Sequence, residues 1–181
     1  MQLNHPPQNQ RGVALFISLV LLLVLTIIGV SAVQTTSLEV RMTRNEHDTL
    51  LAFQAAESAL RDAEAQLEAI TTTTVFTETG NNGLYTVADI GDPEHWKDPD
   101  IWAAGNSIQA ANTIDGVAGQ PRYIIEHVAS VLLENNAYQQ EDPYAAAAND
   151  RVEIFRITAR GMGGTENARV LLQSSYGRIV D

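Results

Sequence analysis

Five acidic side chains lie close together in the segment DIGDPEHWKDPD, which runs from residue 89 to residue 100. Carboxylate oxygens are the hard ligands that Ca²⁺ prefers. Their spacing is not that of an EF-hand loop, so we favour a solvated acidic loop and keep a calcium site as the alternative. No other metal and no cofactor is expected. The calcium candidates are Asp89, Asp92, Glu94, Asp98 and Asp100.

Other residues that could do chemistry form no recognisable catalytic pattern. The glycines at Gly161, Gly163 and Gly164 are not followed by Lys and Ser or Thr, or by a helical segment, so a phosphate-binding loop is excluded. The chain has no cysteine, which excludes disulfides, a thiolate nucleophile and a Cys-ligated metal. Neither a nucleophile elbow nor an HExxH motif is present. We therefore expect that the protein is not an enzyme.

Composition restricts the partners. The 181 residues include 22 Asp and Glu against 11 Lys and Arg, a formal net charge of −11. A protein that binds nucleic acid needs basic patches to neutralise phosphate, and no such patch is visible in the sequence. The acidic balance also disfavours docking on anionic lipid headgroups. We expect no nucleic-acid partner.

The most unusual stretch is the apolar run from Val13 to Val33, within which no residue is charged. A helix of that length spans about 30 Å, the thickness of a bilayer's hydrocarbon core. Arg11 precedes the run, so the positive-inside rule places the N-terminus in the cytoplasm and the C-terminal domain in the periplasm. The alternative is a periplasmic binding domain with a signal peptide cut after Ala32, because Val30-Ser31-Ala32 resembles a signal-peptidase site.

Helical patterning continues beyond this run. No Pro or Gly occurs between Gln34 and Ile70, and apolar residues recur there at steps of three or four. The helix should end where four threonines begin, because β-branched residues disfavour helix. The alanine-rich stretch in its second half should contact the protein's own sheet. We divide the chain into residues 1–12 (a leader), 13–33 (a membrane and assembly half-helix), 34–70 (an amphipathic half-helix) and 71–181 (a globular domain).

Strand patterns dominate the C-terminal part. A short strand is expected at 84–90, and stronger ones at 122–133, 151–160 and 168–176, the last two joined as a hairpin. We therefore predict an α+β fold in which a long N-terminal helix packs on an antiparallel sheet of three or four strands. Long loops at 91–120 and 133–150 carry Trp96, Trp102, Tyr138 and Tyr144, which either pack locally or contact other proteins.

These features together resemble a known family. The segments RGVALFISLVLLLVLTIIGVSA (11–32) and LAFQAAESALRDAE (51–64) are similar to the N-terminal helix of type IV pilins, most closely the PilX-type minor pilins. The resemblance implies the type IV pilin fold. It also implies that prepilin peptidase, a membrane-embedded protease, cuts between Gly12 and Val13 and methylates the new amine of Val13.

One departure from the family pattern is informative. Major pilins carry Glu at the fifth mature position, where this chain has Ile17. In the family that carboxylate pairs with the N-terminal amine of the subunit already in place. The resemblance and this departure predict a minor pilin that primes assembly and sits at or near the pilus tip. Its expected partners are other minor pilins, the major pilin and a large tip adhesin. The alternative within the same class is the tip pseudopilin of a type II secretion system.

Overall fold

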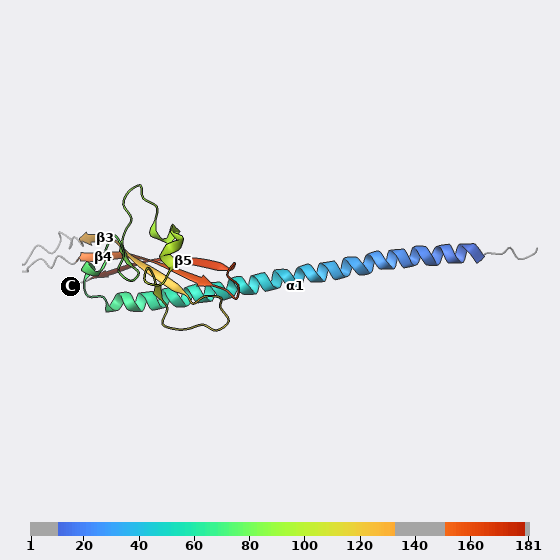
Figure 1. Ribbon diagram of the computed structural model, residues 1–181, viewed down its shortest axis with the longest axis horizontal. Helices are drawn as coiled ribbons and strands as arrows, with labels where there is room; N and C mark the ends of the chain where they lie inside the picture. The colour runs from blue at the N-terminus through green and yellow to red at the C-terminus, as the bar shows by residue number, and fades with distance from the viewer. Residues whose placement is uncertain (1–10, 133–150, 180–181) are drawn as a thin grey trace, which may run out of the picture. The chain divides into compact units, whose positions relative to one another are not determined.

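The computed structural model describes residues 11–132 and 151–179 of the chain (Figure 1). Its internal contacts divide the chain into two compact units, residues 1–45 and 46–181, and each is described by itself. Tyr138 and Tyr144, two of the aromatic residues expected in long loops, lie outside the described residues.

One helix, α1 (Arg11–Ala69), contributes to both units. In the first unit, hydroxyl side chains donate back to the helix, as Thr26 Oγ1 does to the Leu22 carbonyl at 2.6 Å. Hydroxyls in an apolar stretch therefore need no partner outside their own helix. The helix ends at Ala69, just before the threonine run, where Thr72 caps the short 3₁₀ helix η1 (Thr73–Val75).

The globular unit contains a five-stranded sheet in the order β1-β3-β4-β5, with β2 paired to β3 beside β1. Its long strands are β3 (Arg122–Leu132), β4 (Arg151–Met162) and β5 (Arg169–Ile179), and they pair antiparallel. The short ones are β1 (Leu84–Thr86) and β2 (Ile108–Gln109). The predicted hairpin is confirmed, with its turn at residues 163–168.

The α+β prediction is confirmed, but the sheet differs from the expected one in two ways. It has five strands among the described residues, and it is mixed, because β1 runs parallel to β3 with Leu84 opposite Ile125. The expected strand at 84–90 ends at Thr86. Asn82 and Gly83, with φ of 49° and 85°, make the tight turn that sets the direction of β1. The two-residue β2 is too short to give an alternating pattern.

Both faces of the sheet carry packed elements, although the face turned away from α1 stays partly exposed along β5. On one face the second part of α1 lies along the strands (Figure 1), and its buried side chains join a core with Phe76, Phe155 and Ile157. On the other face the loop that carries η2 (His95–Lys97) and η3 (Pro99–Trp102) packs Ile101 and Trp102 against the sheet. Trp96 packs against this second cluster, so both tryptophans are held locally.

Candidate functional site

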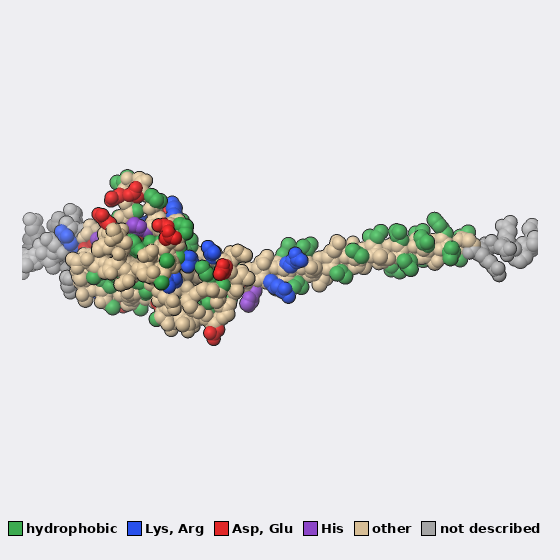
Figure 2. All heavy atoms as spheres, in the orientation of Figure 1, with side chains coloured by type: hydrophobic (Ala, Val, Ile, Leu, Met, Phe, Trp, Pro, Cys, Tyr) green, Lys and Arg blue, Asp and Glu red, His purple; other side chains and the backbone are tan. Residues whose placement is uncertain are grey.

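The first unit presents an apolar surface that no described residue of the chain covers. Every residue from Gly12 to Asn45 is exposed, including Leu15 at 72% and Leu22 at 68%. Figure 2 shows hydrophobic side chains following one another along this part of the helix. By length and composition, α1 contains a segment that can cross a membrane. Such a surface is stable only in lipid or against other protein.

The residues predicted to be processed lie at the start of this surface. Gly12 and Val13 belong to the first turn of α1, and Ile17, about one turn later, is 51% exposed. Nothing lies within 4 Å of the position that a Cβ on Gly12 would occupy. Packing among residues 11–132 and 151–179 therefore does not require glycine at this position.

The second part of α1 meets the sheet through residues without bulk. Ala52, Ala55, Ala56, Ala59 and Ala63 are all fully buried. The predicted contact of this stretch with the protein's own sheet is thereby confirmed. The closest approach is at Gly161 of β4, where a Cβ would lie 2.0 Å from the Ala52 carbonyl oxygen. From the sequence, Gly161 was rejected as part of a phosphate-binding loop and was assigned to the hairpin connection, but it lies within β4. In the structure it is where helix and strand backbones meet.

Polar contacts fasten both ends of this helical stretch. Near its start, the Asp48 carboxylate accepts hydrogen bonds from the hydroxyl and the amide of Thr165, in the β4–β5 turn. These bonds lower the pKa of Asp48, the hydroxyl contributing most. At its end, Arg178 donates to the carbonyls of Leu67 (2.5 Å) and Ile70 (2.7 Å), and the Leu67 carbonyl also accepts from the Ile70 amide at 3.2 Å. None of these three polar residues was singled out from the sequence.

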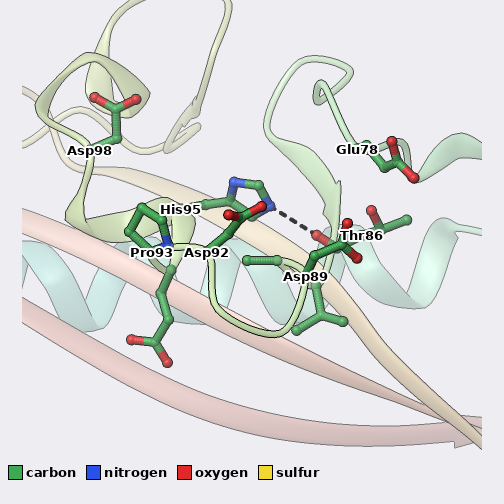
Figure 3. A pocket seen from close by; sticks show the side chains of 10 residues that line it. Glu78, Thr86, Asp89, Asp92, Pro93, His95 and Asp98 are labelled. Carbon is green, nitrogen blue, oxygen red and sulfur yellow. Dashed lines mark hydrogen bonds between the residues drawn. The ribbon is translucent and has the colours of Figure 1, made fainter.

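The acidic loop borders a pocket of about 350 Å³. Four of the calcium candidates, Asp89, Asp92, Glu94 and Asp98, line it, while Asp100 does not. In Figure 3 the His95 ring points toward Thr86, whose carbonyl lies 3.1 Å from Nε2, and Asp98 lies well apart from Asp89 and Asp92. Among the described residues, no group of three acidic or histidine side chains is placed to hold a metal ion.

Two of these carboxylates have structural partners instead. Asp98 caps η3 by accepting from the Asp100 amide at 2.9 Å. Glu94 pairs with Lys97 and with Arg156, each at 3.3 Å, and these contacts, the Lys97 hydrogen bond above all, lower its pKa. The loop is thus tied to the sheet through an arginine, and its carboxylates are used for turns and ion pairs.

Arg156 also reaches a buried carboxylate. Its Nε lies 2.9 Å from Oε2 of Glu126, whose side chain is fully buried. Burial raises the pKa of Glu126, although Arg156 opposes the shift. The other oxygen, Oε1, has no hydrogen-bond partner among the described residues. A glutamate inside the apolar strand sequence YIIEHVASVLL was the available signal for this buried ion pair, and sequence reasoning did not use it.

A serine, a glutamate and a histidine also lie together, on β3 and β4. Glu153 accepts from Ser130 Oγ at 2.7 Å and lies 2.6 Å from His127 Nε2. Burial acts to raise the pKa of Glu153, but the bonds from His127 and Ser130 outweigh it and leave the pKa lowered. The carboxylate lies between the other two groups, so the histidine is not placed to take the serine proton. This order differs from that of a hydrolytic triad.

A long helix with an uncovered apolar first part, followed by a small-residue stretch packed on a sheet, defines a pilin-like protein. The family model described as PilX N-terminal matches residues 11–61, and the model described as type IV pilus assembly protein PilX C-term matches residues 58–178. The chain therefore belongs to the PilX family of type IV pilus assembly proteins.

Membership of this family confirms the resemblance seen in the sequence. The protein is a minor pilin, and its family is structural rather than enzymatic. Its apolar helix fits membrane anchoring and association with other pilus components. No curated protein and no solved structure gave a significant match.

Proposed function

We propose that this minor pilin primes type IV pilus assembly and sits at or near the pilus tip. It does so by packing and not by catalysis. The segment 13–33 is held in the inner membrane until assembly and then leaves lipid for the helical core of the fibre. The globular unit makes the lateral contacts, with other minor pilins, the major pilin and a large tip adhesin as partners.

The observation that carries the tip position is Ile17, which stands where major pilins carry glutamate. A carboxylate at this depth in a membrane costs about 2.5–3.5 kcal/mol or more unless it is paired. In the family the partner is the amine of a subunit already in place. A subunit that enters first has no such neighbour, so an apolar side chain suits it best.

We also propose the processing and topology that go with this function. Prepilin peptidase would cut between Gly12 and Val13 and methylate Val13, with the N-terminus in the cytoplasm and the globular unit in the periplasm. No described residue packs against position 12, and a residue without a side chain would allow the protease to approach the backbone closely, which supports the proposal. The mass of the mature N-terminus tests this. A chain that begins at methylated Val13 supports it, and one that begins at Val33, after a signal-peptidase cut, refutes it.

Priming is tested by deletion and by one substitution. Deleting the gene should abolish or sharply reduce surface pili, and the protein should be present in sheared fibres. Complementation with Ile17→Glu should restore piliation poorly, because its carboxylate would find no amine ahead of it, whereas Ile17→Leu should restore it fully. Normal piliation with Ile17→Glu would argue against the tip position. Normal piliation after deletion, with secretion lost, would instead favour the tip pseudopilin of a type II secretion system.

A further inference from the structure

Three arginines meet on the face of the sheet that is turned away from α1. Arg122 of β3 and Arg160 of β4 stand directly opposite each other in the antiparallel register. Arg169 of β5 is the diagonal neighbour of Arg160, because Leu171 is opposite Arg160 and Met162 is opposite Arg169. Three strands thus bring three positive charges to one end of the sheet.

Each of these arginines is held in place without a carboxylate. Arg122 donates to Ser107 Oγ at 2.7 Å and to the Ser107 carbonyl at 2.5 Å. The guanidinium of Arg160 lies 4.8 Å from the centre of the Trp102 ring. Arg169 donates to the carbonyl of Glu166 at 2.7 Å. Among the described residues, none of the three arginines is in an ion pair with Asp or Glu.

This arrangement works against the stability of the isolated subunit. Like charges directly opposite each other in an antiparallel pair are destabilising. Partial burial lowers the pKa of Arg160, and the charges of Arg169 and Arg122 lower it further. The chain carries 22 acidic residues against 11 basic ones, so carboxylates that could neutralise the cluster are abundant elsewhere in the sequence. Local rules of this kind are most often broken at functional sites.

We propose that the cluster of Arg122, Arg160 and Arg169 is a docking site for carboxylates of an acidic segment on a neighbouring pilus subunit. The guanidinium of Arg160 lies over the Trp102 ring, and a guanidinium can form two parallel hydrogen bonds with a carboxylate. Ser107 holds Arg122, which stands opposite Arg160, so the two cations can share one acidic partner. This inference rests on the proposed role in pilus assembly and specifies its lateral contact.

The first test separates docking from a structural role. Arg160→Met keeps an unbranched side chain against Trp102 and removes the charge. Full-length protein in detergent should unfold at the same temperature as wild type or higher, because repulsion is relieved. Its amount in sheared pili should fall about tenfold or more, the usual effect of losing a charge-assisted hydrogen bond. Arg61→Met is the control, since Arg61 is exposed and paired with Glu57 at 3.2 Å, and it should change neither quantity.

The second test identifies the partner. A photo-crosslinking residue at Leu171, which is 44% exposed and opposite Arg160, should form a covalent adduct with an acidic segment of another pilus subunit. The adduct should disappear in the Arg160→Met background. Reversing the charge of the crosslinked carboxylate in the partner should reproduce the loss from pili.

Several results would overturn the docking proposal. These are normal amounts of Arg160→Met in pili, a lower unfolding temperature that explains its loss, or adducts with lipid alone. Failure of the proposed priming role looks different. In that case deletion leaves piliation normal, while the crosslink at Leu171 still reports whether the arginines meet a neighbouring subunit.

Discussion

The close approach of α1 to β4 makes a sharp prediction for Gly161→Ala. The added Cβ would lie 2.0 Å from the Ala52 carbonyl oxygen and 2.4 Å from the Ala56 amide nitrogen. Both are backbone atoms of a buried helical stretch, so neither can rotate aside as a side chain would. The helix and the strand must therefore separate locally to admit the methyl group.

The size of the effect follows from this geometry. Overpacking a core usually costs about 1–3 kcal/mol, and rigid backbone neighbours place this site at the top of that range or above. Alanine gains back about 0.5–1 kcal/mol because glycine is itself unfavourable within a strand. We expect a net loss of about 2–3 kcal/mol. For a unit of this size that corresponds to a fall of about 6–12 °C in unfolding temperature.

Tryptophan fluorescence of the full chain in detergent measures this unfolding, because Trp96 and Trp102, the only tryptophans in the chain, both pack against the sheet. Gly177→Ala is the matched control. Gly177 lies on the neighbouring strand β5, and its added Cβ would meet Val152 Cγ1 at an ordinary 3.4 Å. It should leave the unfolding temperature unchanged or slightly raised. If the unfolding temperatures of Gly161→Ala and Gly177→Ala differ by less than about 2 °C, the backbones of α1 and β4 do not approach each other as closely at Gly161 as described.

Three further predictions concern titratable groups. Thr165→Val should raise the pKa of Asp48 toward its ordinary value in an NMR titration. In the wild-type protein, the lowered pKa of Asp48 stabilises the folded state above about pH 4, and this contribution is lost as the pH falls through the lowered pKa. The variant should lack this pH-dependent contribution. An unchanged Asp48 titration would contradict this. Burial raises the pKa of Tyr123 to about 12, so its tyrosinate absorbance, isolated by comparison with Tyr123→Phe, should appear only near that pH. The neutral Tyr123 side chain contributes its full stabilisation of the fold below about pH 10, and this contribution is lost as the pH rises toward 12. Ionisation of Tyr123 near pH 10 would show that the side chain is not buried. Arg156→Met should cost about 3–5 kcal/mol at pH 7 by leaving Glu126 buried and unpaired, and less in acid, where the raised pKa lets Glu126 take up a proton. Adding Glu126→Gln should recover most of the loss, and equal destabilisation at pH 5 and pH 7 would count against the ion pair.

The elements that the sequence predicted best are those with long periodic patterns. The helix up to Ala69 and the three long strands all carry such a pattern, because each buries one face over many residues. The parallel strand β1 was not foreseen as parallel. Its three residues are positioned by the turn at Asn82 and Gly83 and by pairing with β3, and direction is not encoded in so short a pattern.

Side-chain sites were predicted less well, for a related reason. The contacts of Asp48 with Thr165 and of Asp62 with the Ala111 amide at 2.8 Å join residues far apart in the chain, and a lone aspartate on a helix does not reveal them. The acidic loop was conspicuous in sequence, yet its carboxylates cap a turn and hold Arg156. Composition shows where charge is concentrated, but tertiary pairing decides which charges are neutralised.

The part of α1 in the second unit buries small residues against the sheet, whereas the part in the first unit exposes large apolar residues. In the second unit, small residues such as Ala52 and Ala59 let the helix lie directly on a sheet, so the surface they bury is covered within the chain. In the first unit, large residues such as Leu15 and Leu22 remain exposed, and none of that unit's described residues covers them. Large apolar side chains are stabilised by lipid and by other apolar helices to a similar degree. A segment of this composition can therefore exchange one environment for the other at little cost, which is what the proposed passage from membrane to fibre requires.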